Sequence, residues 1–252
     1  MKRIKDLPIQ VAQYWRGLPF AWKTTLRLHP LFNYLNRNRS IIIDHLRRSS
    51  NVGHVVEIAC GTGEFARKIL DNCNPDRYTA IDINPISIQE ARNILSLDPR
   101  VTLIEGNIYD DPVRKLIPKA DNVICFNALM HFPDLDEIFR YIHEEVLVTG
   151  GKFIGDIVNS AREKEMVLIE SRGVDRPNYI RTGGRYLERR RALKQFKSGE
   201  ISGSAIPKMI KEGLLRTYSL TRTELEKRLS AAGFQVDLIH EGYDLLFFAS
   251  KR

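Results

Sequence analysis

Val55-Val-Glu-Ile-Ala-Cys-Gly-Thr-Gly63 is the stretch that says most about the architecture of this chain. It begins with β-branched apolar residues around Glu57, which favour a buried strand. It ends with Gly61 and Gly63, which let the backbone turn sharply and come close to a ligand. A helix-period segment follows at 64–72, and its first N–H groups would face the same loop. The stretch therefore predicts a strand, a glycine loop and a helix, with a ligand site at the loop.

Short β-rich apolar runs alternate with helix-period segments through this part of the chain. We expect strands at 52–58, 78–83, 101–105, 122–126 and 152–158, and helices at 64–72, 85–95, 112–116 and 134–147. Strands that alternate with helices imply right-handed crossovers, a parallel sheet and helices on both of its faces. The glycine loop then lies at the carboxyl ends of the strands, where such sheets bind ligands.

The alternation stops after the fifth strand and resumes near the C-terminus. Residues 160–218 have apolar positions at helical spacing, interrupted by glycines. Glu224 follows Thr221 at the spacing of a capping box, so a helix is expected to begin there and to end at Gly233. Two apolar runs flank Glu241-Gly242 and predict a final hairpin.

Length and composition are those of an ordinary globular protein. The 252 residues are 43% hydrophobic and 28% charged, which suits one sizeable core with an appendage. No apolar run approaches the roughly 18 residues of a membrane-spanning helix, so no transmembrane segment is expected. Cys60, Cys73 and Cys125 form no Cys-x-x-Cys pair, so neither a disulfide framework nor a metal site is expected. These features favour a cytoplasmic protein.

The net charge of +8 is unevenly distributed along the chain. Residues 1–50 carry ten Lys and Arg against two Asp and Glu, and residues 181–218 carry ten against three. Residues 51–180 carry 14 against 21, and residues 219–252 carry five of each. An acidic body thus has two basic segments attached to it, and these segments indicate an anionic partner.

Two classes of cofactor fit the glycine loop. Gly61, Gly63 and Ala66 match the spacing of a dinucleotide-binding loop, and Asp82 is placed to bond a ribose in either class. Glu57 separates the two classes, because its carboxylate would repel a pyrophosphate and would suit the ammonium group of a methionine-type ligand.

Five ordered segments resemble the motifs of class I S-adenosylmethionine-dependent methyltransferases, of the small-molecule, ubiquinone-biosynthesis-like type. They are residues 55–63, Ala80-Ile-Asp82, Leu103-Ile-Glu-Gly-Asn107, Val123-Ile-Cys-Phe-Asn-Ala-Leu-Met-His131 and Ala232-Gly-Phe234. The resemblance covers about residues 50–158 and 219–250. It implies an α/β fold, a Rossmann-like doubly wound seven-stranded sheet with a C-terminal antiparallel hairpin, and S-adenosyl-L-methionine as the cofactor.

The same resemblance implies a division of the chain. Residues 51–158 and 219–252 would form the cofactor-binding core, residues 1–50 an N-terminal helical cap, and residues 159–218 a helical insertion. In this family such helices and insertions commonly fold over the cofactor as a lid and supply the substrate pocket.

The resemblance also assigns roles at the cofactor's amino-acid end. Gly61 and Gly63 would lie against its amino-acid and ribose portions. Glu57 would hold the methionine end, and Asp82 would accept hydrogen bonds from both ribose hydroxyls. Asn127 would start the loop beside the methionine end and the sulfonium.

The resemblance implies three contacts with the adenine. It also covers one further position, in the glycine loop. Asn107 would contact the adenine amino group, and Ile83 and Ile108 would enclose the ring. Asn107 stands where many members have Asp, and it keeps an acceptor oxygen. Ala59 stands where many members have Gly, and it fits if its φ is negative.

Candidate residues for chemistry and for substrate contact lie outside these motifs or at their ends. His131 is a candidate general base for a hydroxyl or an amine. The alternative is a histidine that only shapes the pocket, since methyl transfer often needs only alignment and desolvation. The substrate-contact candidates in the basic segments are Tyr14, Arg185, Tyr186 and Arg189. Their alternatives are helix packing for the aromatics and a solvated helix face for the arginines.

These features predict a methyltransferase that acts on oxygen or nitrogen of a small acceptor, either anionic or carrier-tethered, with carbon methylation left open. One alternative is a tRNA or rRNA methyltransferase whose basic segments track phosphates and in which Trp15, Trp22 or Tyr186 stacks a base. Against this, we find no recognisable RNA-binding module in the sequence. A second alternative is a non-catalytic protein that binds nucleotides or an anionic membrane surface.

Overall fold

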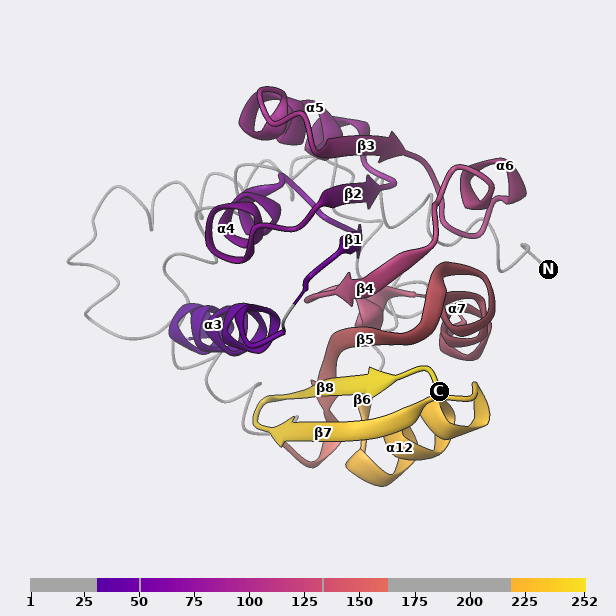
Figure 1. Cartoon of the computed structure of the whole chain (residues 1–252). Helices are drawn as coiled ribbons and strands as arrows, with labels where there is room; N and C mark the ends of the chain where they lie inside the picture. The colour runs from indigo at the N-terminus through magenta and orange to yellow at the C-terminus, as the bar shows by residue number, and fades with distance from the viewer. Residues whose placement is uncertain (1–30, 50, 133, 163–218) are drawn as a thin grey trace, which may run out of the picture.

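The computed structural model describes residues 31–49, 51–132, 134–162 and 219–252, which form one sheet with helices on both faces (Figure 1). The helices are α3 (Leu31–Arg47), α4 (Glu64–Cys73), α5 (Pro85–Leu95), α6 (Asp111–Arg114), α7 (Leu135–Tyr141) and α12 (Arg222–Ala231). The strands are β1 (His54–Ile58), β2 (Arg77–Asp82), β3 (Val101–Glu105), β4 (Ala120–Cys125), β5 (Leu147–Asn159), β6 (Ser219–Leu220), β7 (Gln235–Glu241) and β8 (Asp244–Ser250).

The strands follow the order β3-β2-β1-β4-β5-β8-β7, and β6 pairs with β5 beside this path. The first five strands are parallel, whereas β8 is antiparallel to both of its neighbours, β5 and β7. This confirms the doubly wound sheet and the C-terminal antiparallel hairpin. The two-residue strand β6 makes the sheet eight-stranded rather than the seven-stranded sheet that was expected. Strand order reverses between β1 and β4, and a ligand crevice is expected at that point.

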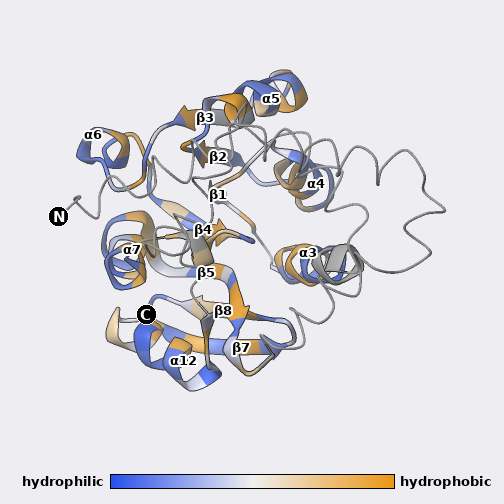
Figure 2. Cartoon of the chain, turned by 180° about the vertical axis from the view of Figure 1, so that it is seen from behind, coloured by the Kyte–Doolittle hydropathy of each residue, from blue (hydrophilic) through white to orange (hydrophobic). Residues whose placement is uncertain are grey.

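Hydrophobic clusters cover the two faces of the sheet. On one face α3, α4 and α5 bury side chains such as Ile42, Phe65 and Ile88. On the other face α7 and α12 bury Phe139 and Leu229. The apolar sides of these helices turn toward the sheet (Figure 2). The sheet is therefore covered on both faces, as the alternation of strands and helices predicted.

Most expected elements are present, and local chemistry explains their starts. At α12 the Thr221 N–H donates to the Glu224 carboxylate over 2.8 Å and the Glu224 N–H donates to the Thr221 hydroxyl, which confirms the capping box. The helix expected at 134–147 is shorter, because α7 passes into a π-helical turn, Ile142–Val146.

Strand β5 begins at Leu147, five residues before the expected start at 152. Gly150 and Gly151 lie within β5, although glycine is a common turn residue. There the Gly150 N–H donates to the Lys251 carbonyl over 2.7 Å. This contact with the last residues of the chain is not visible in the local sequence.

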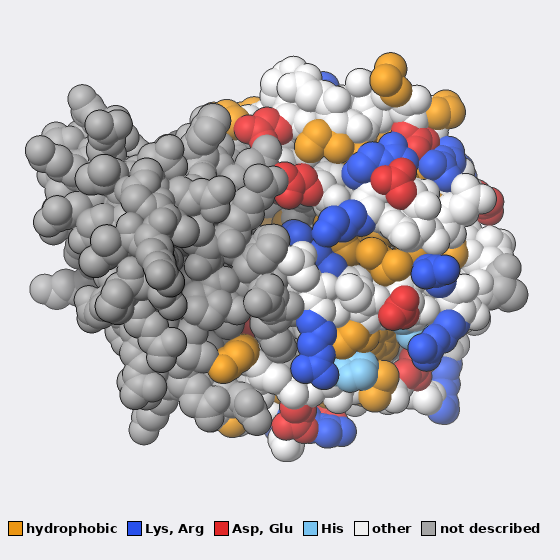
Figure 3. All heavy atoms as spheres, turned by 90° about the vertical axis from the view of Figure 1, so that its left-hand side faces the viewer, with side chains coloured by type: hydrophobic (Ala, Val, Ile, Leu, Met, Phe, Trp, Pro, Cys, Tyr) orange, Lys and Arg blue, Asp and Glu red, His pale blue; other side chains and the backbone are white. Residues whose placement is uncertain are grey.

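Several expected features lie outside the described residues. They include most of the N-terminal cap and of the insertion, together with Tyr14, Arg185, Tyr186 and Arg189. No helix in the described part of the chain is both long and apolar enough to cross a membrane. On the face that carries α3 and α4, basic and acidic side chains lie interspersed over the described surface (Figure 3).

Candidate functional site

The loop between β1 and α4 is shaped by left-handed backbone at its glycines. Gly61 has φ +57°, and a Cβ placed there would meet nothing within 4 Å. Gly63 has φ +78°, and a Cβ there would come within 2.9 Å of Leu95 and 3.2 Å of Ala91, both in α5. Gly63 therefore permits close helix packing, whereas Gly61 leaves open space at the carboxyl end of β1.

Ala59 has φ +60°, so the negative φ that would let an alanine fit here without strain is not present. The residue lies directly after β1, and its backbone conformation is left-handed although it carries a Cβ. Such a conformation costs an L-residue about 1–2 kcal/mol. The loop thus stores strain at the position where the family pattern has glycine.

Asp82, the last residue of β2, ties two loops together. Its Oδ2 accepts the Gly61 N–H over 2.8 Å, and its Oδ1 accepts the Asn84 N–H over 2.8 Å. The side chain is 9% exposed, and burial raises the pKa of this carboxyl. Each oxygen keeps a second lone pair, so Asp82 is still able to accept hydrogen bonds from a ligand.

Asn107, just after β3, lies at the same end of the sheet and has an unpartnered donor. Its Oδ1 accepts the Tyr109 N–H over 3.1 Å, while its buried Nδ2 has no hydrogen-bond partner among the described residues. Ile108 is buried beside it, and Ile83, after β2, is partly exposed. The amide nitrogen is thus without a partner, and the oxygen keeps a second lone pair, so both atoms of the amide are able to bond a ligand.

Glu57 lies inside the sheet rather than at its surface. It is 3% exposed, and its Oε2 accepts a hydrogen bond from the Tyr78 hydroxyl over 2.8 Å. Burial raises the pKa of Glu57 to about 7, although the Tyr78 hydrogen bond and the charge of Arg39 oppose this. The carboxyl is therefore already partly satisfied within the protein, and it is easily protonated.

Arg39 of α3 also lies at this site, although no local sequence pattern indicates it. Its guanidinium carbon lies 5.5 Å from the centre of the Phe65 ring and 5.7 Å from that of Phe126. Its buried Nε has no partner among the described residues. Burial lowers the pKa of Arg39, and the nearby carboxylates oppose this. These carboxylates are Glu57, Glu64 and Asp156. Arg39 thus places one cation above the carboxyl ends of β1 and β5.

Asp156 of β5 also joins the site. Its Oδ1 accepts the N–H of Asn127, which follows β4 with φ +56°, and its Oδ2 has no partner among the described residues. Asp156 is fully buried, and Asp244 of β8 is 5% exposed. In the sequence, the feature that could have indicated Asp156 is that it is a single acid within the apolar run at 153–158. For His131, the structure describes only the backbone, at the end of the short 3-10 helix Leu129–His131.

The cysteines lie in apolar surroundings. Burial raises the pKa of the Cys60 and Cys125 thiols well above the usual range, so both are held as neutral thiols near pH 7. In the described ranges, no group of three His, Cys, Asp or Glu side chains is arranged to hold a metal ion.

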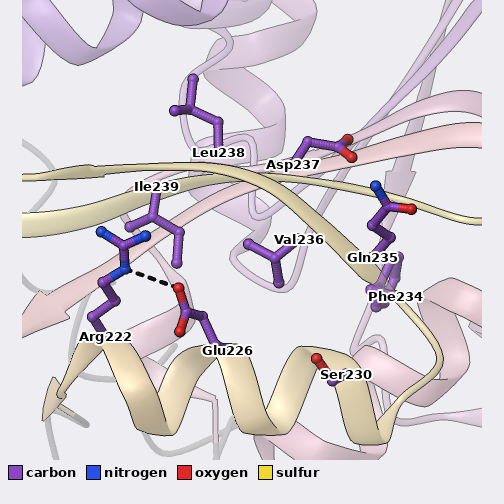
Figure 4. Close-up of a pocket in the computed structure, with 9 residues that line it drawn as sticks. All are labelled: Arg222, Glu226, Ser230, Phe234, Gln235, Val236, Asp237, Leu238 and Ile239. Atoms are coloured by element: carbon purple, nitrogen blue, oxygen red, sulfur yellow. Dashed lines mark hydrogen bonds and ion pairs between the residues drawn. The ribbon is translucent and has the colours of Figure 1, made fainter.

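A hollow of about 400 Å³ lies between α12 and β7, at the edge of the sheet (Figure 4). Arg222 and Glu226 form an ion pair of 2.8 Å on one side of it, and Val236 and Ile239 of β7 line the other. None of the site residues described above lines this groove.

The crevice residues fit S-adenosylmethionine. Open space adjoins Gly61, acceptor oxygens remain on Asp82, and a buried donor remains on Asn107. The acidic surroundings of Glu57 and Asp156 suit a ligand that carries an ammonium and a sulfonium, and disfavour a pyrophosphate.

Comparison with known proteins agrees with this arrangement. Residues 56–153 match the sequence model of a methyltransferase domain family. No curated protein sequence matches the chain.

Solved structures share the fold. N-methyltransferase NodS from Bradyrhizobium japonicum, in complex with S-adenosylhomocysteine, is 13% identical, and the match covers 88% of each chain with a TM-score of 0.53. A protein from Listeria monocytogenes assigned as an S-adenosylmethionine-dependent methyltransferase is 16% identical, with coverage of 86% of this chain, 99% of that one and a TM-score of 0.56.

An O-methyltransferase family protein from Burkholderia thailandensis is also similar, at 16% identity and a TM-score of 0.55. The match covers 84% of this chain and 55% of that protein, so this chain spans about half of its length. At these identities the likeness to solved structures shows the fold alone. Residues 56–153 thus match a methyltransferase domain, and the described chain has the fold of the solved methyltransferases.

Proposed function

We propose that this chain transfers a methyl group from S-adenosylmethionine to oxygen or nitrogen of a small acceptor that is anionic or tethered to a carrier. The observation that carries the proposal is the set of buried polar atoms around the carboxyl ends of β1, β2, β3 and β5. These atoms are enclosed in the protein, which suits a small ligand more than a long polyanion.

The residues of the crevice divide the binding of the cofactor among themselves. Asp82 accepts the ribose hydroxyls, and the Nδ2 group of Asn107 donates to a ring nitrogen of the adenine. Arg39 binds the carboxylate of the amino-acid portion, since its buried Nε has no hydrogen-bond partner among the described residues and it lies near the carboxylates of Glu57 and Asp156. The cofactor supplies an electrophilic methyl group carried on a sulfonium.

The protein's own part in the transfer is positioning. The backbone after β4, held at Asn127 by Asp156, orients the loop that leads to His131. Holding donor and acceptor about 3–3.5 Å apart and excluding water accounts for most of the rate in such reactions. His131 remains the candidate for removing a proton from the acceptor.

The charge of the acceptor is inferred from the sequence. The basic excess lies in residues 1–50 and 181–218, the segments that would cover the crevice as a lid. The surface seen in Figure 3 adds no continuous basic patch on the described part of that face. We infer that these two basic segments contact a single anionic group on a small acceptor, because a long polyanion would need a continuous basic surface.

Release of S-adenosylhomocysteine tests the proposal directly. Wild-type protein is incubated with S-adenosylmethionine and either a panel of small hydroxy and amino acids, phosphates and acyl-carrier thioesters, or bulk tRNA. The proposal predicts turnover with a member of the small-molecule panel and background turnover with tRNA. Methyl incorporation into tRNA alone would favour the nucleic-acid alternative.

A variant in which Arg189, Arg190 and Arg191 are replaced by Gln separates acceptor binding from cofactor binding. We expect a raised KM for the anionic acceptor and an unchanged affinity for S-adenosylhomocysteine. Equal loss of both would count against an anionic acceptor.

A further inference from the structure

We propose that Tyr109 and Arg114 are positioning residues that join the adenine loop, residues 106–110, to the first turn of α7. Through them, binding of the cofactor orders the loop at 127–134, which leads into α7 and contains His131. This inference rests on the proposed methyltransferase function, in which the adenine lies at Asn107 and the acceptor lies beside the loop at 127–134.

The hydroxyl of Tyr109 bonds the backbone of Asp134 in both directions. It donates to the Asp134 carbonyl over 2.8 Å and accepts the Asp134 N–H over 3.3 Å. Tyr109 is 3% exposed, and burial raises the pKa of its hydroxyl, which therefore keeps the proton that it donates. Separating these groups is costly, because a buried polar group would lose its partner. Tyr109 therefore fixes the backbone of Asp134 relative to the adenine loop.

The backbone of Tyr109 holds the other end of this link. Its N–H donates to Oδ1 of Asn107 over 3.1 Å, so the same residue orients the amide that meets the adenine. The Gly106 N–H donates to the Asp82 carbonyl over 3.0 Å, and a Cβ at Gly106 would come within 2.5 Å of Val113 in α6. The adenine loop is thus packed against β2 and α6, and the Tyr109 side chain connects it to the start of α7.

Arg114 of α6 forms a second link to the same turn. Its Nε donates to the Ile108 carbonyl over 2.8 Å, and its Nη2 pairs with Oε1 of Glu137 over 2.8 Å. Glu137 lies in the first turn of α7, and its N–H donates over 2.9 Å to Oδ1 of Asp134, the N-cap residue. The guanidinium carbon lies 4.4 Å from the centre of the Tyr141 ring, which favours this position. Two separate links therefore join the adenine loop to Asp134 and Glu137.

The loop at 127–134 is held at both of its ends. Asp156 accepts the N–H of Asn127 at one end, and Tyr109 bonds Asp134 at the other. A ligand that orders the adenine loop therefore also restricts the second end of this loop. Such coupling is reciprocal, so an acceptor that orders the loop at 127–134 raises the affinity for the cofactor in turn. The cofactor and the acceptor are therefore expected to bind with positive cooperativity.

Amide hydrogen exchange, followed residue by residue by NMR on the full chain, tests these links. The readout is the exchange rate of the Glu137 N–H with and without S-adenosylhomocysteine, because this amide keeps its Asp134 acceptor in every variant used. In wild type we expect the ligand to slow this exchange at least about threefold. The Gly61 N–H, bonded to Asp82 in the glycine loop, reports in the same spectra that the ligand is bound.

Tyr109→Phe keeps the ring and the backbone contacts and removes only the hydroxyl. We expect the ligand effect at Glu137 to fall by at least about half, and the affinity for S-adenosylhomocysteine to stay within about threefold of wild type. Adding Arg114→Gln removes the second link, so the effect at Glu137 disappears while that at Gly61 remains. Tyr141→Phe is the matched control and behaves as wild type, because it loses a hydroxyl that bonds only the Arg114 carbonyl, over 3.2 Å.

The inference is overturned if the ligand slows exchange at Gly61 but not at Glu137 in wild type, or if either variant keeps the whole effect at Glu137. If the double variant does not fold, Tyr109→Phe decides by the same criterion. Failure of wild type to bind S-adenosylhomocysteine at all would instead contradict the proposed function. The two failures are therefore distinguishable.

Discussion

Gly61 donates its backbone N–H to Oδ2 of Asp82 over 2.8 Å, so the glycine loop after β1 is held to the end of β2. The second oxygen of Asp82 holds the backbone of Asn84 at the start of α5. One carboxylate thus fixes two of the loops that border the crevice. A residue expected only to contact the ribose also shapes the site.

Asp82→Asn is expected to weaken binding of S-adenosylhomocysteine by at least about tenfold. An amide accepts one of the two backbone N–H groups and points its own N–H at the other, and hydrogen bonds to charged groups are worth about 1.5–3 kcal/mol. Calorimetry measures the affinity. Asp98→Asn is the matched control, because Asp98 bonds Arg67 and Arg100 away from the crevice. Equal loss in both variants would contradict this role of Asp82.

Ala59→Gly is expected to leave the free energy of unfolding unchanged or to raise it by up to about 1 kcal/mol. Glycine relieves the strain of φ +60° at this position, and the greater entropy of the unfolded chain offsets part of the gain. Urea unfolding measures the effect. The control Ala66→Gly, inside α4, loses about 1 kcal/mol or more. A loss at Ala59 as large as that at Ala66 would contradict the strain.

Local patterns predicted the parts of the fold that depend on nearby residues. The capping box of Thr221 and Glu224 spans three residues, and the strand and helix alternation needs only periodicity. The glycine loop and the acids that end β1 and β2 were found in the same way. Five motifs in order then indicated the cofactor.

The remaining features depend on contacts between distant segments. Arg39 meets Phe126 and the charge of Asp156 only because α3 packs across the sheet. The left-handed φ of Ala59 arises from the path of the folded loop, and no residue type announces it. The Asn107 side chain is oriented by the Tyr109 N–H, which donates to its oxygen, and its amide nitrogen is left without a partner.

Asn107→Asp is expected to weaken binding of S-adenosylhomocysteine by about two- to tenfold. The change keeps the oxygen that accepts the Tyr109 N–H and removes the donor Nδ2, which is worth about 0.5–1.5 kcal/mol in a neutral hydrogen bond. Asn72→Asp adds the same charge on the exposed side of α4 and serves as control. Equal or tighter binding by Asn107→Asp would show that the oxygen accepts from the adenine amino group instead.

Glu57→Gln is expected to gain stability relative to wild type as the pH rises from 4.5 to 7. The folded pKa of Glu57, about 7, lies above the ordinary value of 4.5, so its favourable contribution is present at low pH and is lost as the pH rises through 7. Gln is neutral throughout and is able to accept the Tyr78 hydrogen bond. The difference grows by up to about 3 kcal/mol. Urea unfolding at pH 5 and pH 8 measures it, and a difference independent of pH would contradict the buried, protonatable Glu57.

Binding of the cofactor at the Gly61 loop is tested by calorimetry with S-adenosylhomocysteine and with NAD, on wild type, Gly61→Ala and Gly150→Ala. Both glycines have positive φ, +57° and +79°, and a Cβ at either meets nothing within 4 Å, so the two variants carry the same backbone strain. We expect wild type and Gly150→Ala to bind S-adenosylhomocysteine and not NAD, and Gly61→Ala to lose that binding. Binding of NAD alone, or equal loss in both variants, would contradict a methyltransferase site at this loop.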